Sequence, residues 1–376
     1  MGFFDGLRRN RKEEEAHREA AAQQAHQVEE DIENRESADD GEPIHDEEMI
    51  IEKVQVVERD VPQTESDDGN ADGEKSEEVK QADMHNSAQE TVEDEEPVHE
   101  EEQIPFREIK SYSEKKPLTH VVGETKIIAI INQKGGVGKS TTAIDLSAAL
   151  GEMNKAVLLV DLDPQGNATS GLGIEKSKLH QCVYDVLLDD VDVRDVIIPD
   201  VCEGLDLVPA TINLAGAEVE LVSEMARENR LKDAIGSLRG KYDYIFVDCP
   251  PSLGLLTVNS LVAADKLIIP IQCEFYALEG VTKLLDSMKR VKTRLNPSLD
   301  IFGILLTMYD GRTTLSKQVA AEVRNFFGSK VFDTVIPRTV KLSEAPSYGL
   351  PITQYDPTGK GSLAYKDLAK EVIKRA

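Results

Sequence analysis

Residues 126–142 read KIIAIINQKGGVGKSTT, and this stretch decides the fold. The apolar run at 126–132 favours a buried strand, and AIDLSAAL at 143–150 has the pattern of a helix. Glycines between them allow consecutive backbone N–H groups to turn toward phosphate oxygens, and the helix N-terminus adds its positive dipole end. In such a loop Lys139 reaches the β- and γ-phosphates, and the Ser140 hydroxyl is a ligand for Mg²⁺. The stretch therefore predicts a strand, a phosphate-binding loop and a helix in succession.

Further short apolar runs follow, separated by helix-length periodic segments such as SKQVAAEVRNFF. The runs are AVLLVDL (156–162), LDLVPA (205–210), YDYIFVDC (242–249), KLIIPI (266–271), FGILLT (302–307) and VFDTVIP (331–337). They are apolar throughout instead of alternating, which is typical of strands covered on both faces. Repeated strand–helix units predict an α/β fold, a mostly parallel twisted sheet flanked by helices. Ligands of such sheets bind beyond the carboxyl ends of the strands, so we expect the chemistry there.

Two of the loops after these runs carry carboxylates. Asp163 follows AVLLVDL, where a carboxylate beside a phosphate loop can orient an attacking water and lie near Mg²⁺. Asp161, inside the strand end, is expected to be structural. Asp248 ends the run YDYIFVD and is expected to hold the Mg²⁺ shell through water. Cys249 beside it has no second Cys or His at ligand spacing, so we expect a small buried residue there.

Charge is distributed unevenly along the chain of 376 residues, which has 70 acidic and 43 basic side chains and a net charge of −27. Residues 1–120 contain 37 acidic and 14 basic side chains, a net charge of −23, and the remaining residues carry −4. A segment so acidic and so poor in apolar residues cannot offset its conformational entropy by burial. We therefore expect a disordered acidic N-terminal extension at 1–120 and a folded domain at 121–376.

Membrane and redox signals are weak. No run of 18 apolar residues occurs, so we expect no stable membrane insertion. The first residues, MGFFDGLRRNRK, combine three large apolar side chains with four cations and suggest a weak membrane-surface anchor. The acidic extension is open to three interpretations: an interaction arm, a nucleic-acid mimic that competes for a basic surface, or a solvating tail. The four cysteines have no C-x-x-C spacing, which favours a reducing cytosol over a zinc or disulfide framework.

The phosphate loop departs from the common pattern G-x-x-x-x-G-K-[ST], because Gln133 stands where a glycine is usual and Lys134 opens the loop. The resulting K-G-G-V-G-K-S-T resembles the deviant phosphate loop of the family that includes ParA-type partition ATPases, MinD-like ATPases and nitrogenase iron protein. Further stretches resemble the chromosomal ParA/Soj branch: DPQGNATSGLG (163–173), CEFYALEG (273–280), LLTMYDGRT (305–313) and VIPRTVKLSEAPSYGLPI (335–352). The likeness runs from about residue 126 to 376 and leaves out the acidic extension.

The resemblance implies a site for ATP and Mg²⁺ with residues in named roles. Asp163 positions the water, while Lys139 and a Lys134 reaching across a dimer interface offset the charge that develops during hydrolysis. ATP contacts are implied for Lys134, Gly135, Gly136, Val137, Gly138, Lys139, Ser140 and Thr141 and, near the adenine, for Pro337 and Thr339. Mg²⁺ contacts are implied for Ser140, Asp163 and Asp248. Thr339 replaces the Asn that is usual in the family.

The same resemblance implies an ATPase that dimerises on ATP and binds double-stranded DNA without sequence preference. A ParB-like centromere-binding partner is expected to stimulate hydrolysis that is weak alone, during segregation of a chromosome or a plasmid. The expected location is cytoplasmic and nucleoid-associated, in a bacterium. Arg312 and Lys341 match DNA-contacting positions of the family, and Arg338 and the basic run at 289–294 are further candidates. Such cations contact phosphates and do not read bases.

Four alternatives stay open at this point. A MinD-like membrane-cycling ATPase needs an amphipathic anchor, for which only the N-terminal FFDGL is available. A bacterial tyrosine kinase of the same superfamily has a tyrosine-rich tail, whereas Tyr365 stands alone in a helical stretch. An iron-protein-like reductase needs two suitably placed cysteines, and Cys249 and Cys273 lack the surrounding motifs. A nucleotide-gated adaptor hardly hydrolyses ATP, and the presence of both Asp163 and Asp248 argues against it.

Overall fold

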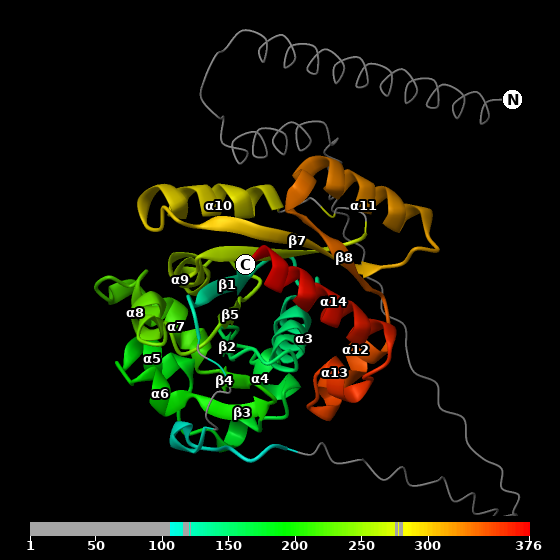
Figure 1. The fold of residues 1–376 in the computed structure, drawn as a ribbon. Coiled ribbons are helices and arrows are strands. Elements are labelled where there is room, and N and C mark those ends of the chain that lie inside the picture. Colours follow the sequence, from blue (N-terminus) through cyan, green and yellow to red (C-terminus); the bar gives the residue numbers. More distant parts are fainter. Residues whose placement is uncertain (1–105, 116–119, 121, 275–276, 278–280) are drawn as a thin grey trace, which may run out of the picture. The chain divides into compact units, whose positions relative to one another are not determined.

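Eight strands form one sheet in the computed structural model, which describes residues 106–115, 120, 122–274, 277 and 281–376 (Figure 1). The strands are β1 (Lys126–Ile130), β2 (Val157–Asp161), β3 (Ile198–Cys202), β4 (Leu205–Val208), β5 (Tyr244–Asp248), β6 (Lys266–Gln272), β7 (Asp300–Tyr309) and β8 (Val331–Pro337). Their order across the sheet is β3-β4-β2-β5-β1-β6-β7-β8, and β3 alone runs antiparallel to its neighbour among the described strands. The expected α/β class with a mostly parallel sheet is confirmed.

Helices cover both faces of this sheet (Figure 1). They are α3 (Lys139–Gly151), α4 (Asn167–Gly171), α5 (Val183–Leu188), α6 (Val193–Val196), α7 (Leu214–Glu220), α8 (Arg230–Gly236), α9 (Leu255–Ala263), α10 (Val281–Arg294), α11 (Thr314–Phe327), α12 (Lys341–Glu344), α13 (Ile352–Tyr355) and α14 (Lys360–Arg375). Short 3₁₀ helices lie at η1 (Tyr112–Glu114), η2 (Lys176–Lys178), η3 (Leu221–Ser223), η4 (Gly328–Lys330) and η5 (Ala345–Tyr348). One core cluster packs α5–α11 against one face, and a second packs α3, α4 and α12–α14 against the other.

Strand β1 shows why the apolar runs are continuous. Ile127 and Ala129 contribute to the first cluster and Ile128 and Ile130 to the second, and all four are at most 2% exposed. Because successive side chains of a strand point to opposite faces, a strand covered on both sides is apolar at nearly every position. The core of the fold therefore lies on both faces of the central strands.

Strand register sets the position of the expected site. Strand β5 lies between β2 and β1, and Asp248 pairs in register with Asp161 on one side and with Ile130 on the other. The loop that follows β1 therefore starts beside both carboxylates. All three chain segments leave the sheet at the carboxyl edge, where an α/β sheet places its ligands.

Part of the sequence upstream of β1 also contacts the fold. Within the described residues these contacts begin at Arg107, whose backbone N–H donates to the carbonyl oxygen of Gly173 at 2.8 Å. The expected limits at 120 and 121 stay a prediction. Residues 1–105, with most of the acidic extension and the FFDGL stretch, lie outside the described residues, as does most of 275–280. In the part that the structure describes, no helix is long and apolar enough to cross a bilayer.

Candidate functional site

The phosphate loop joins β1 to α3, and two of its glycines adopt backbone conformations that other residues resist. Gly136 has φ of 73° and Gly138 has φ of 90°, and Gly138 precedes the first residue of α3. A Cβ atom is disfavoured at positive φ, so the sequence needs glycine at these two turns. The side chain of Lys139, on the first turn of α3, folds back until its Nζ lies 3.3 Å from the carbonyl oxygen of Lys134. The first helical turn thus places an ammonium over the loop.

Two polar side chains, one just after β1 and one near the end of β7, hold this loop. The hydroxyl of Thr307, at 2% exposure, donates to the carbonyl oxygen of Val137 at 2.8 Å. Asn132 accepts a hydrogen bond from the N–H of Lys134 at 3.0 Å and donates to the carbonyl of Pro270 at 2.7 Å. The loop is therefore tied to β6 and β7 by bonds within the protein. Gly135 and Gly136 remain exposed, so the concave side of the loop is open.

Three carboxylates converge beside the loop. Asp161 and Asp248 are fully buried and Asp163 is 6% exposed. Burial raises the pKa of Asp161 to about 6, although hydrogen bonds from Thr169 oppose the shift. Burial, and then the charge of Asp161, raise the pKa of Asp248 well above its ordinary value. Repulsion between adjacent buried carboxylates is the expected cost of a site built to receive a cation.

Lys139 provides part of the compensating charge. Burial lowers its pKa, whereas the charge of Asp248 is the strongest influence that keeps it protonated. Both carboxylate oxygens of Asp248 are buried without a hydrogen-bond partner, although the neighbouring Ser140 hydroxyl partly favours its ionised form. Orphaned buried oxygens beside a hydroxyl fit a hydrated Mg²⁺, which prefers oxygen ligands and keeps several waters. Among the described residues, no group of three or more His, Cys, Asp or Glu side chains is placed to hold a metal ion by itself.

Asp163 is held by a short relay of hydrogen bonds. Its N–H donates to Oδ1 of Asp161 at 3.2 Å, and its own Oδ1 accepts from the N–H of Gln165 at 2.9 Å. Asp161 Oδ2 in turn accepts from the N–H of Thr169 at 2.8 Å and from its hydroxyl at 2.7 Å. Asp161 is therefore a structural residue, as the sequence predicts, and it ties the Asp163 loop to α4.

Comparisons with known proteins decide the family. A family model described as an AAA domain matches residues 125–301. The sporulation initiation inhibitor protein Soj of Bacillus subtilis is 60% identical over 247 residues, which are 66% of this chain and 98% of Soj. The chromosome-partitioning ATPase Soj of Treponema pallidum is 50% identical over 250 residues, which are 66% of this chain and 98% of that protein. The chain belongs to the ParA/Soj family of chromosome-partitioning ATPases.

Solved structures share the fold of this ParA/Soj ATPase. A protein described as cobyrinic acid a,c-diamide synthase from Mycobacterium smegmatis, with bound ADP and magnesium, is 41% identical. Its TM-score is 0.59, and the match covers 66% of this chain and 94% of that one. The septum site-determining protein MinD of Pyrococcus horikoshii, complexed with Mg-ADP, is 29% identical with a TM-score of 0.54 over 67% of this chain and 99% of MinD.

The residues expected near the adenine lie at the same sheet edge of the ParA/Soj domain. Pro337 ends β8 and pairs in register with Tyr309, which ends β7. Thr339, two residues further, is half-buried. Because Thr307 of the same β7 end contacts the phosphate loop, Pro337 and Thr339 lie on the β8 side of that loop. Their contact with a base stays a prediction.

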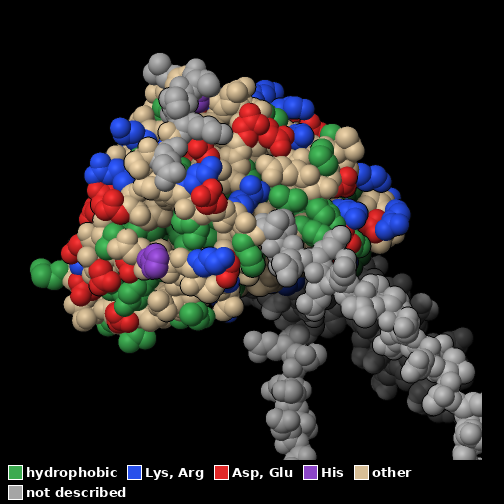
Figure 2. Space-filling model, turned by 90° about the horizontal axis from the view of Figure 1, so that it is seen from below, with side chains coloured by type: hydrophobic (Ala, Val, Ile, Leu, Met, Phe, Trp, Pro, Cys, Tyr) green, Lys and Arg blue, Asp and Glu red, His purple; other side chains and the backbone are tan. Residues whose placement is uncertain are grey.

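Three of the cations predicted to contact DNA, namely Arg312, Lys341 and Arg338, have an acidic neighbour, and DNA contact by the basic run at 289–294 stays a prediction. Arg312 makes two hydrogen bonds to Asp310, at 2.9 and 2.7 Å, and its side chain is 91% exposed. Lys341 lies 2.8 Å from Glu344, and Arg338 lies 3.6 Å from Glu274. On the face shown in Figure 2, Lys and Arg side chains are likewise interspersed with Asp and Glu. The cations of this ATPase are therefore partly neutralised within the chain.

The sequence interpretation missed the residues that hold the loops of this ATPase. Thr307 and Asn132 end apolar runs that were read as strands, and a polar residue at such a position was the available signal. No feature of the sequence indicates the role of Thr169, because its two hydrogen bonds to Asp161 depend on the position of α4 beside the end of β2. The catalytic roles expected for Lys134, Lys139 and Asp163 stay predictions.

Proposed function

We propose that this ParA/Soj protein is a partition ATPase that dimerises on ATP, binds DNA without sequence preference and is cycled by a ParB-like partner. The observation that carries the proposal is the meeting of Lys139, Ser140, Asp163 and Asp248 at one sheet edge. The open glycine loop offers backbone N–H groups to phosphates. Magnesium and ADP bound to the two similar solved structures support the choice of ATP and Mg²⁺.

Hydrolysis is proposed to proceed by in-line attack of water on the γ-phosphate. Asp163, held by its bonds to Asp161 and Gln165, orients the water. The Lys139 ammonium and Lys134 from a second copy stabilise the charge that develops on the transferred group. Ser140 and Asp248 would hold Mg²⁺, which would neutralise phosphate charge when bound.

Exposed apolar side chains support the proposal that a second copy of the chain binds here. They lie on α7, on η3 and in the flanking turns, and they are 57–88% exposed: Ile212, Val219, Val222 and Met225. Glu218, on the same α7, accepts a hydrogen bond from the N–H of Leu255 at 2.8 Å and so ties α7 to the first residue of α9. Apolar patches of this kind mark protein interfaces. A copy that covers this surface would approach the site from the side of Asp248.

DNA binding is proposed for Arg312, Lys341 and Arg338. Their partial neutralisation predicts weak binding by one copy, and a dimer doubles the number of cations that face the duplex. Binding to phosphates releases counterions, so affinity must fall steeply with salt. Association with the nucleoid follows from binding that ignores sequence.

The test measures binding of the full chain to non-specific duplex DNA with ADP, ATP and a slowly hydrolysed ATP analogue, at two salt concentrations. We expect salt-sensitive binding with the triphosphates alone. Asp163→Ala should bind DNA with ATP and fail to hydrolyse it, with or without a ParB-like protein. Absence of DNA binding in every nucleotide state at low salt would refute the proposal, and ATP-dependent binding to anionic vesicles instead would favour a MinD-like cycle.

A further inference from the structure

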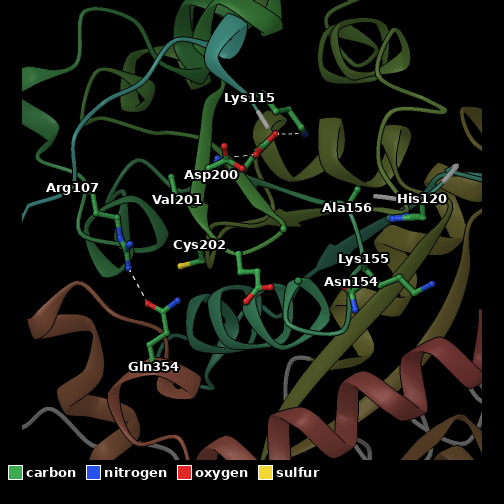
Figure 3. A pocket seen from close by; sticks show the side chains of 14 residues that line it. Arg107, Lys115, His120, Asn154, Lys155, Ala156, Asp200, Val201, Cys202 and Gln354 are labelled. Carbon is green, nitrogen blue, oxygen red and sulfur yellow. Dashed lines mark hydrogen bonds and ion pairs between the residues drawn. The ribbon is translucent and has the colours of Figure 1, made fainter. Parts of the chain in front are cut away.

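A segment upstream of the matched family region contacts the end of α4, helix α13 and strand β4. This segment, residues 106–115, is called the strap here. Arg107 makes three bonds to the fold: its N–H donates to the Gly173 carbonyl at 2.8 Å, its Nε to the Leu172 carbonyl at 2.8 Å, and its Nη2 to Oε1 of Gln354 at 3.2 Å. In Figure 3 the side chains of Arg107 and Gln354, which both line a pocket next to β3 and β4, point toward each other. The strap thereby joins the end of α4 to α13.

The other end of the strap is anchored by a buried charge. Nζ of Lys115 lies 2.5 Å from Oδ2 of Asp206, and Asp206 is 2% exposed. The hydroxyl of Tyr242 donates to the same oxygen at 2.6 Å, and the ammonium lies 4.0 Å from the centre of the Tyr242 ring. Tyr112 adds a contact with the first core cluster. A segment fixed at both ends has a defined path along the β3–β4 edge of the sheet.

The two carbonyls that accept hydrogen bonds from Arg107 follow directly after α4, the helix that is tied through Asp161 to the Asp163 loop. Helix α4 has five residues, too few to be stable without tertiary contacts. A cation at its C-terminus satisfies carbonyls that have no helical partner and complements the helix dipole. Inside α4, Thr169 donates both of its hydrogens to Asp161, which accepts the N–H of Asp163. The backbone of α4 thus links the hydrogen bonds of the strap, at the end of the helix, to the hydrogen bonds that Thr169 and Asp161 make toward the Asp163 loop.

We propose that Arg107 is a positioning residue for ATP hydrolysis, acting through α4 on Asp163. The inference rests on the proposed role of Asp163 in orienting water. Without Arg107, the end of α4 loses its cap, the bonds from Thr169 to Asp161 weaken, and Asp163 samples more positions. The phosphate loop has its own supports in Thr307 and Asn132, so ATP binding is unaffected.

The test compares Arg107→Ala, Arg107→Lys and Lys110→Ala in the full chain. Lys110 is a matched control because it lies in the strap, carries the same charge, and makes no hydrogen bond to α4 in the described part of the chain. We expect kcat for ATP to fall about threefold to tenfold in Arg107→Ala with KM unchanged. Arg107→Lys should recover at least half of the decrease in log kcat, because an ammonium can still donate to the Leu172 carbonyl.

Amide hydrogen exchange at residues 167–174 supplies a readout that does not depend on turnover. Exchange there should be faster in Arg107→Ala than in Lys110→Ala, while exchange in α3 stays equal. Unchanged exchange in α4 would overturn the inference whether or not ATP is hydrolysed. A raised KM with unchanged kcat would also overturn it, because Arg107 would then act on binding. If the unaltered chain hydrolyses no ATP, the proposed function fails, and the exchange comparison still decides whether the strap holds α4.

Discussion

Replacing Glu344 with glutamine should strengthen DNA binding. Oε2 of Glu344 lies 2.8 Å from Nζ of Lys341 and also accepts the Tyr355 hydroxyl at 2.9 Å. Hydrogen bonds from Lys341 and Tyr355 lower the pKa of Glu344, so the carboxylate is charged at neutral pH. Glu344→Gln removes that charge beside a proposed DNA contact and keeps an amide oxygen for the tyrosine.

The size of the effect follows from the geometry. A DNA phosphate bound to Lys341 would lie roughly 6 Å from the Glu344 carboxylate, two charge-assisted hydrogen-bond lengths away. At that separation, in a water-like dielectric with physiological salt, Coulomb repulsion corresponds to about a twofold change in affinity for each copy. A dimer presents two such sites, so we expect DNA affinity to rise about fourfold.

Fluorescence anisotropy with a labelled duplex and the slowly hydrolysed ATP analogue measures this change. Asp367→Asn is the matched control, because Asp367 and Lys370 form an exposed pair of the same spacing and the same 2.8 Å distance. Helix α12, which carries Lys341, packs through Leu342 beside Gly361 at the start of α14. The Asp367–Lys370 pair lies further along α14 and is therefore separate from that contact. The gain for Glu344→Gln should shrink at high salt. Equal affinities of Glu344→Gln and the unaltered chain at low salt would show that Lys341 does not face DNA.

Three further substitutions test the architecture. Lys115→Met should lower the free energy of unfolding in denaturant by about 2–4 kcal/mol, because the Asp206 carboxylate stays buried without its cation. Adding Asp206→Asn should restore most of that stability, and a loss by Lys115→Met within error of zero would contradict the strap anchor. Burial raises the pKa of Asp145 to about 7 from an ordinary 3.8, so the folded state holds the extra proton and stability falls as pH rises from about 4 to 7. Asp145→Asn should remove up to about 4 kcal/mol of that fall, and equal pH profiles for both chains would refute the assignment. Thr307→Val leaves the Val137 carbonyl without its donor and should weaken ATP binding about fivefold to tenfold. Titration calorimetry measures the affinity, and the thermal stability of the variant serves as the control.

Local patterns were sufficient for the central strands and for the phosphate loop. Each apolar run quoted above overlaps a strand, because a strand covered on both faces is apolar at most of its positions. Strand β3 was not predicted, because its sequence IPDVC includes Pro199 and Asp200. Proline is tolerated on an edge strand, where one row of N–H groups needs no partner in the sheet. Asp200 adopts φ of 54°, where the pairing of β3 with β4 is irregular.

Contacts between distant segments could not be read from the sequence. Arg107 and Leu172 are 65 residues apart, and Thr307 and Val137 are 170 residues apart. Neither pair belongs to a short motif, since each bond exists only because the sheet order brings the two segments together. Arg107 also lies at the end of an acid-rich stretch that offers no apolar period to indicate docking. Motif reasoning therefore located the groups proposed to act on phosphate and missed the groups that hold them.

The supports of the site fall into two independent sets, and this separation has a mechanistic consequence. Thr307 and Asn132 hold the phosphate loop from β6 and β7, while Asp163 is held through α4. A change that acts on α4 can alter the rate of hydrolysis without altering nucleotide affinity. A partition cycle requires such a control, because a stimulated copy must hydrolyse ATP that it has already bound. On the inference above, the strap supplies one support of α4 from outside the region that the family model matches, which begins at residue 125. A structural change in the strap would then alter the position of Asp163 without altering the affinity for the nucleotide.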